Sequence, residues 1–142
     1  MEPFSSAEIA LGLFLLHPKH LPLLQELITP EQGFAHALYA HCTAILAGGN
    51  YIHGIPLPPE LSERANILRL FCEEHGFSDW TASLVEREIR RNCINANRTL
   101  LRSKQREISQ KLFTAKQHGD TLEEELLRTQ YQQILKLDKM AA

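Results

Sequence analysis

The sequence predicts an all-α protein, and three observations lead to this prediction. No segment alternates apolar and polar residues over the length that a half-buried strand needs. Apolar residues recur instead at helical spacing along most of the chain. The 142 residues, 44% of them apolar, suffice for one compact domain with an appendage. We expect a small helical bundle subdomain followed by a long helix and a C-terminal antiparallel helical hairpin.

The first helix has a start signal in the sequence. Ser5, with Glu8 three residues later, forms a capping-box pattern before an apolar helix from about Ala7 to Leu16. Pro18 ends that helix, because proline cannot continue one without losing a hydrogen bond. A second short helix is expected from His20 to Ile28.

The third helix is expected to start at Thr29, which is a candidate N-cap with Pro30 at the first helical position. It runs to about Ala47 and ends at Gly48-Gly49, as C-terminal glycines end many helices. Its apolar positions are Phe34, Leu38, Cys42, Ile45 and Leu46.

Residues 50–59 are rich in proline and are expected to form an irregular loop. A fourth helix from about Glu60 to His75 follows, with one face formed by Leu61, Ala65, Leu68 and Cys72. Ser78 or Asp79 is the candidate cap of the next helix, and Trp80 is expected to anchor that helix to the preceding body.

No Pro or Gly occurs between Trp80 and His118, so the sequence predicts one helix of about 36 to 38 residues and about 55 Å. Its apolar stripe begins with Ile89, Cys93, Ala96 and Leu100, then shifts by one residue to Leu101, Ile108, Leu112 and Ala115. The first part should pack on the body, and the second on whatever follows Gly119. We therefore divide the chain into a globular subdomain, residues 1–80, and a subdomain of the long helix and hairpin, residues 81–142.

The last helix, about 19 residues long, carries more apolar residues than one partner helix covers. Leu127, Tyr131 and Ile134 can form a seam with the long helix. Leucines that lie partly to the side of this seam are Leu122, Leu126, Leu135 and Leu137. They are either ordinary exposed leucines, which are common on protein surfaces, or the anchors of a docking face.

Charge is distributed unevenly along the chain, whose net charge is −2. Residues 1–82 carry three basic and nine acidic side chains, residues 83–118 nine and three, and residues 119–142 three and five. The basic middle segment is either a solvated helix or a site for phosphates or an acidic protein surface.

The cysteines and the hydropathy of the sequence indicate the cellular compartment in which the protein is expected. Cys42, Cys72 and Cys93 are odd in number and widely spaced, which favours reduced thiols and a cytoplasmic protein. The longest apolar run, Ile9 to Leu16, is too short to cross a bilayer, so no membrane partner is expected.

The sequence contains none of the common catalytic motifs for nucleotide, serine-hydrolase or zinc-protease chemistry, so we do not expect an enzyme. Three pairs are candidate metal ligands: His17 with His20, Cys72 with His75, and His41 with Cys42. None has a second matching pair, so neither a metal nor any other cofactor is expected.

The order of features resembles a known family. The opening Glu8-Ile-Ala-Leu-Gly-Leu-Phe-Leu-Leu-His-Pro18, the short leucine-rich helices, the long charged helix and the tail with Leu126-Leu127 and Tyr131-Gln-Gln-Ile-Leu-Lys136 are similar to the C-terminal helicase-binding domain of bacterial DnaG-type primases. The resemblance covers nearly the whole chain. It rests on patterns of helix and turn, and is strongest in the opening helix and the tail.

The resemblance implies a non-catalytic module of the primosome that acts in DNA replication. In that family the module docks primase on the N-terminal domains of the hexameric replicative helicase, mainly through the hairpin, while primer synthesis belongs to other domains of the DNA-directed RNA polymerase. Partner contacts carried over by position fall on Leu122, Leu126, Leu127, Tyr131, Gln132, Leu135, Lys136 and Lys139. Tyr131 could equally pack in the seam, and the residues after Lys136 leave the register of the terminal contacts open.

Two other functions remain open. One is an N-terminal fragment of a replicative helicase, because the globular part of the family is built like that domain. The other is a nucleic-acid-binding helical protein, with the basic side chains Arg87, Arg90, Arg91, Arg98, Arg102, Lys104 and Arg106 contacting phosphates.

Overall fold

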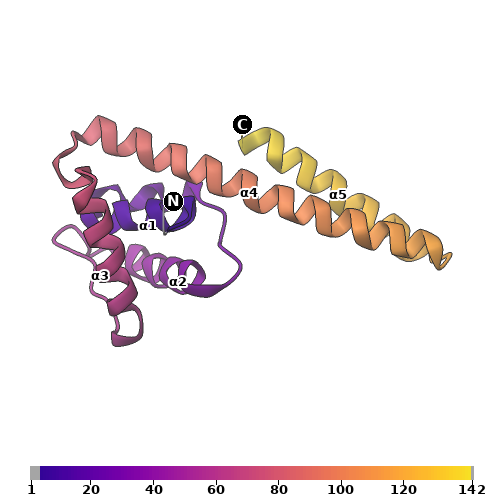
Figure 1. Cartoon of the computed structure of the whole chain (residues 1–142), viewed down its shortest axis with the longest axis horizontal. Coiled ribbons are helices and arrows are strands. Elements are labelled where there is room, and N and C mark those ends of the chain that lie inside the picture. The colour runs from indigo at the N-terminus through magenta and orange to yellow at the C-terminus, as the bar shows by residue number, and fades with distance from the viewer. Residues whose placement is uncertain (1–3, 142) are drawn as a thin grey trace. The chain divides into compact units, whose positions relative to one another are not determined.

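The structure is a computed structural model that describes residues 4–141 (Figure 1). Its elements, in order, are α1 (Ser6–Leu16), the 3-10 helix η1 (Pro18–Glu26), α2 (Gly33–Gly48), α3 (Pro59–Glu74), the 3-10 helix η2 (Phe77–Asp79), α4 (Ala82–Gln117) and α5 (Thr121–Ala141). Residues 4–141 contain no strand, so the predicted all-α class is confirmed. No helix in this range is long and apolar enough to cross a membrane.

The chain divides into two compact units between Ala96 and Asn97. The sequence placed the division near residue 80, at the start of the long helix. The difference arises because the first part of α4 belongs to the core of the first unit, where Val85 and Ile89 are fully buried. The expected role of this part of the helix, packing on the body, is therefore confirmed, but the unit boundary falls inside α4.

Helix α1 is the centre of the first unit. All residues from Ile9 to Leu15 are buried, which explains why the helix is apolar on every side. The predicted capping box is present: the Ser5 hydroxyl accepts a hydrogen bond from the Glu8 backbone N–H at 3.2 Å, and the Glu8 carboxylate accepts one from the Ser5 N–H at 3.1 Å.

Helix α3 packs closely on α1. A Cβ added at Gly12 would lie 2.9 Å from the Leu68 Cγ and 3.0 Å from the Cys72 Sγ, so the two helices meet at a position that only glycine fits. The four residues expected on the core face of α3 are buried: Leu61, Ala65, Leu68 and Cys72.

The segment before α2 differs from the sequence expectation in two ways. The expected second short helix is present but begins at Pro18 instead of His20, and it is a 3-10 helix, which is compatible with the missing N–H of Pro22 in its interior. Thr29 does not cap the third helix, because α2 begins at Gly33. The Pro30 carbonyl instead accepts a hydrogen bond from the His36 ring at 2.7 Å, which ties the preceding segment to the first turn of α2.

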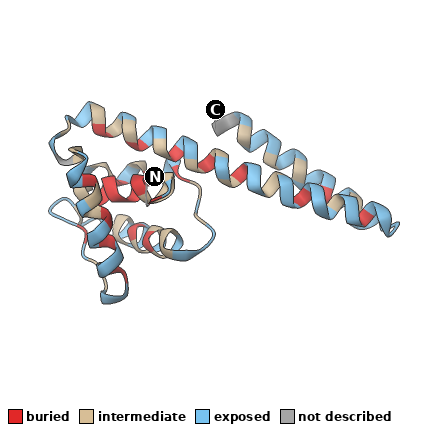
Figure 2. Ribbon diagram, viewed as in Figure 1, coloured by how far each residue is buried: buried red, intermediate tan, exposed pale blue. Residues whose placement is uncertain are grey.

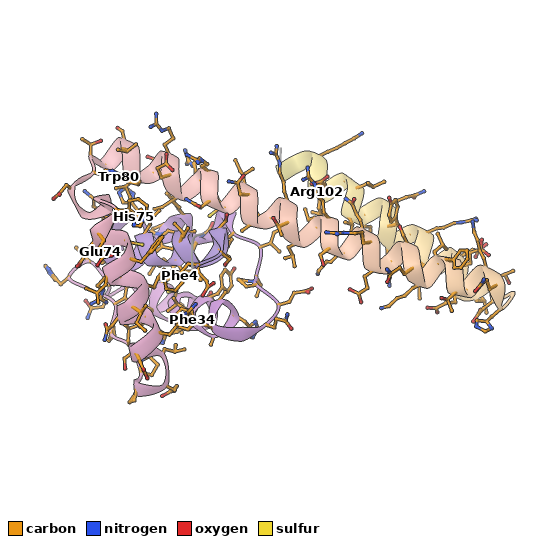
Figure 3. All side chains as sticks on the ribbon, in the orientation of Figure 1. Phe4, Phe34, Glu74, His75, Trp80 and Arg102 are labelled. Atoms are coloured by element: carbon orange, nitrogen blue, oxygen red, sulfur yellow. The ribbon has the colours of Figure 1, made fainter. Side chains whose placement is uncertain are left out.

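The start of α4 also differs from the prediction. Ser78 and Asp79 lie in η2, and the Thr81 hydroxyl accepts the capping hydrogen bond from the Leu84 N–H at 3.3 Å. Trp80 is half-buried against the first core, with its ring centroid 4.3 Å from that of Phe77, so an anchoring role fits its position (Figure 3). The 36 residues of α4 agree with the predicted length.

Candidate interaction surface on the terminal helix pair

The second unit consists of the C-terminal part of α4 and all of α5, which we call the terminal helix pair, residues 97–141. Its small core contains the buried side chains of Ile108, Ala115 and Leu127, flanked by the half-buried Leu112, Tyr131 and Ile134. These residues include the three that the sequence placed in the seam with the long helix. Outside the seam, most of α5 is exposed (Figure 2).

The chain reverses direction between the two helices at a glycine. Gly119 has φ +66°, a conformation that costs other residues energy. The Asp120 N–H donates to the Ala115 carbonyl at 3.0 Å and the Gly119 N–H donates to the Lys116 carbonyl at 3.2 Å, which is the Schellman pattern. The Asp120 carboxylate then accepts a hydrogen bond from the Glu123 N–H at 3.1 Å and caps α5.

Three exposed leucines lie on one side of α5. Leu122 is 81% exposed, Leu126 55% and Leu137 48%. At 100° per residue these positions fall within about 60° of one another around the helix, beside the buried seam. We call this group the leucine flank. Helix α4 does not cover this apolar surface, which belongs to the small second unit.

The expected partner-binding residues do not form one face. Leu122 and Leu126 belong to the leucine flank, whereas Leu135, which is 40% exposed, lies on the other side of the seam. The exposed polar residues Gln132, Lys136 and Lys139 occupy the back of α5 and the side nearer Leu135. A single docked partner on one side of the helix would therefore contact a part of this set.

Leu127 is a correction to that set. Its side chain is only 3% exposed and packs against α4, so a partner could reach it only by opening the helix pair. Tyr131 was considered equally for the seam and for the partner; it is half-buried and packs on the same small core. Leu137, in contrast, lies to the side of the seam as its helical spacing predicts, although the resemblance assigns it no partner contact.

Three of the seven basic residues of α4 that the sequence offers as phosphate contacts form ion pairs or are half-buried. Arg90 binds Glu26 at 3.0 Å and Glu86 at 2.9 Å, and the hydrogen bond with Glu26 followed by these two charges raises its pKa. Arg91 pairs with Glu88 at 3.4 Å. Arg98 is half-buried, whereas Arg102 and Arg106 are exposed.

Phe113 is an exposed aromatic residue that the sequence reasoning did not single out. It is 64% exposed, although it lies only two residues before the buried Ala115. Helical spacing predicts this exposure, because a residue two positions from a seam residue lies about 200° away around the helix.

An open groove of about 520 Å³ lies beside the turn between the two helices, lined by Glu107, Gln110, Lys111, Thr114, Ala115, His118, Asp120 and Glu123. Several of its polar groups already have structural roles. Lys111 pairs with Glu107 at 3.2 Å, and Asp120 caps α5. The groove is therefore explained by the helix reversal and its local polar contacts.

The candidate metal ligands serve in packing and backbone hydrogen bonds. His17 donates from Nε2 to the Phe77 carbonyl at 2.8 Å, and His75 donates from Nδ1 to the Phe71 carbonyl at 2.9 Å. All three cysteines are buried free thiols, and burial raises the pKa of each to about 12. Among residues 4–141 no three metal-binding side chains gather in one place.

Comparisons with protein-family models, curated proteins and solved structures returned no match to this chain.

Proposed function

We propose that this chain is a non-catalytic docking module that attaches a primase to the N-terminal domain of a replicative helicase through the leucine flank of α5. The proposal has two supports. One is the resemblance of the opening helix and the tail to the helicase-binding domain of bacterial primases. The other is the exposure of the flank.

The leucine flank is the observation that carries the proposal. Leu122, Leu126 and Leu137 expose apolar surface next to a seam that is already filled. Burying such leucines under a partner removes apolar surface from water, and each well-packed anchor can contribute about 1 to 3 kcal/mol. A helix that offers two apolar anchors one turn apart, as Leu122 and Leu126 are, fits a groove or a helical surface on a partner protein.

The neighbouring leucines Leu126 and Leu127 allow a matched test. We expect Leu126→Ala to weaken calorimetric binding of the full chain to the purified helicase N-terminal domain about tenfold, because the side chain is an exposed anchor. The same substitution should leave the unfolding temperature unchanged. Leu127→Ala removes the same atoms from the seam, so it should lower the stability of the terminal helix pair.

Leu135→Ala identifies the side that docks. Leu135 lies across the seam from the leucine flank, so its truncation should change the affinity little if the flank is the docking surface. A large loss with Leu135→Ala and none with Leu126→Ala would move the site to the opposite side of α5. No binding of the wild-type chain to the helicase domain would refute the proposed function.

Lys136 and Lys139 should act differently from the leucines. Both are exposed charges, and exposed charges at the edge of an interface mainly affect association rates and salt dependence. A measurement at low and high salt therefore separates their contribution from that of the apolar anchors, which salt affects little.

A further inference from the structure

One face of α4 carries exposed cations that form no ion pair with an acidic residue within residues 4–141. It consists of Arg102, Arg106, Phe113 and Lys116, which we call the α4 stripe. At 100° per residue these four side chains start within about 80° of one another, along about 21 Å of the helix axis. Arg106 and Phe113 each precede a seam residue, Ile108 and Ala115, by two positions, so they lie on the far side of α4 from α5, whereas Arg102 and Lys116 lie to the side of the seam.

The lack of acidic partners sets these cations apart from their neighbours. Between Glu88 and Asp120 the sequence contains one acidic residue, Glu107, and its carboxylate pairs with Lys111 at 3.2 Å. On α5, Arg128 pairs with Glu124 at 2.6 Å. In the part of the chain that the structure describes, no ion pair engages Arg102, Arg106 or Lys116.

Phe113 gives the stripe a second kind of contact. Its ring is 64% exposed and lies between Arg106 and Lys116 along the same face. An exposed aromatic ring among cations offers a stacking surface for an unpaired base while the cations contact the backbone phosphates. Arginine side chains four residues apart are separated by about 6 Å along the helix, which is comparable to the spacing of phosphates along one strand.

We propose that the α4 stripe binds single-stranded nucleic acid, with Arg102, Arg106 and Lys116 on phosphates and Phe113 stacked on a base. This inference goes beyond the proposed function and does not depend on it, because it uses a different helix face from the leucine flank. An acidic protein surface would satisfy the cations but would leave Phe113 without a partner of matching chemistry. Duplex DNA would present phosphates but no free base to the ring.

The test uses the full chain and a fluorescently labelled oligo-dT of about 20 nucleotides, with binding followed by anisotropy. If three cations contact phosphates, affinity should fall about 20-fold between about 50 and 200 mM salt, since the logarithmic slope for single strands is about −0.7 per contact. Arg102→Gln/Arg106→Gln/Lys116→Gln should remove most of the binding and most of this salt dependence. Far-ultraviolet circular dichroism checks that the helices are retained.

A control with the same loss of charge comes from paired cations. Arg91→Gln/Lys111→Gln/Arg128→Gln removes three positive charges that each neighbour an acid on the same helix, at 3.4, 3.2 and 2.6 Å. It should weaken binding far less than the stripe variant. An equal loss in both variants would show a general charge effect and overturn the proposal.

The substitution Phe113→Leu distinguishes binding of nucleic acid from binding of other polyanions. The substitution keeps an apolar side chain but removes the ring, and loss of base stacking should weaken oligo-dT binding about fivefold or more. Competition with polyglutamate provides the other arm. In the contrary outcome, polyglutamate displaces the oligonucleotide at an equal concentration of negative charge while Phe113→Leu leaves the affinity for oligo-dT unchanged. The stripe would then bind acidic protein surfaces, and the nucleic-acid assignment would be wrong. Absence of saturable oligo-dT binding by the wild-type chain would also overturn it.

Discussion

Gly12 shows how strongly a single position can depend on the absence of a side chain. Its hydrogen faces Leu68 and Cys72 at the contact of α1 with α3, and both of these side chains are fully buried. In Gly12→Ala the new Cβ would lie 2.9 Å from the Leu68 Cγ. We expect the steric cost, about 1–3 kcal/mol, to exceed the gain of up to about 1 kcal/mol in helix propensity, so the free energy of unfolding should fall in urea titrations.

Gly48→Ala is the matched control for this prediction. Gly48 is the last residue of α2, and an added Cβ would meet no heavy atom within 4 Å. The free energy of unfolding should stay the same or rise by up to about 1 kcal/mol, because alanine restricts the unfolded chain. Equal effects of the two substitutions would contradict the close contact at Gly12.

His20 makes stability depend on pH. Burial, followed by the charges of Lys19 and His17, lowers its pKa below the ordinary 6.5, and its Nε2 is a buried atom without a hydrogen-bond partner in the described structure. The unfolded chain therefore binds a proton at His20 more readily than the folded chain. The contribution of the neutral His20 ring to the free energy of unfolding should be fully present above about pH 6.5. It should decrease as the pH falls from there towards the lowered pKa of His20.

The measurement is urea unfolding of the wild-type chain and His20→Gln at a series of pH values around and below 6.5. The difference in unfolding free energy between the two proteins isolates the contribution of this ring from those of the carboxylates. The wild-type chain should lose more stability than the variant on acidification. Parallel pH profiles would show that His20 does not titrate differently in the folded state.

At the scale of the elements, the sequence was sufficient wherever the signal was long or strongly periodic. The uninterrupted segment after Trp80 predicted a helix of the observed length, and Gly119 predicted its end. The capping box of α1 was recognised because both of its side chains make their contacts within one turn. These features depend on local chemistry, and local chemistry is readable from the sequence.

The starts of α2 and α4 were predicted less well for a related physical reason. Thr29-Pro30 and Ser78-Asp79 have the composition of helix starts, but neither begins the helix. The hydrogen bonds observed at these two helix starts involve other residues. The His36 ring bonds to the Pro30 carbonyl, and the Thr81 hydroxyl bonds to the Leu84 N–H. Several neighbouring residues could cap each helix, and tertiary packing selects among them.

The candidate site was predictable in composition but only partly in arrangement. Helical spacing correctly placed Leu127, Tyr131 and Ile134 in the seam. The positions carried over from the family resemblance then combined buried and exposed residues in one set, although Leu126 and Leu127 differ by about 100° around the helix. Adjacent leucines on a helix cannot serve the same partner equally, and burial decides which one is available.

At the scale of the whole molecule, the two compact units differ greatly in the size of their cores. Among the described residues the first core has 19 buried members, whereas that of the terminal helix pair has three. Two helices with so little buried apolar surface gain little free energy against the conformational entropy of their ordering. We therefore expect the terminal helix pair to open more readily than the first unit.

Hydrogen exchange measured by mass spectrometry can check this difference. Amides of α5 should exchange faster than those of α1 and α3, because opening of the small seam does not require the first core to unfold. Leu127→Ala should accelerate exchange in residues 97–141 and leave α1 and α3 protected, whereas Gly12→Ala should act mainly on α1 and α3. If either substitution instead changed protection equally in both units, the chain would unfold as a single cooperative unit despite its two cores. The expected asymmetry also suits the proposed docking role, since a partner that covers Leu126 would stabilise the less stable unit through mass action.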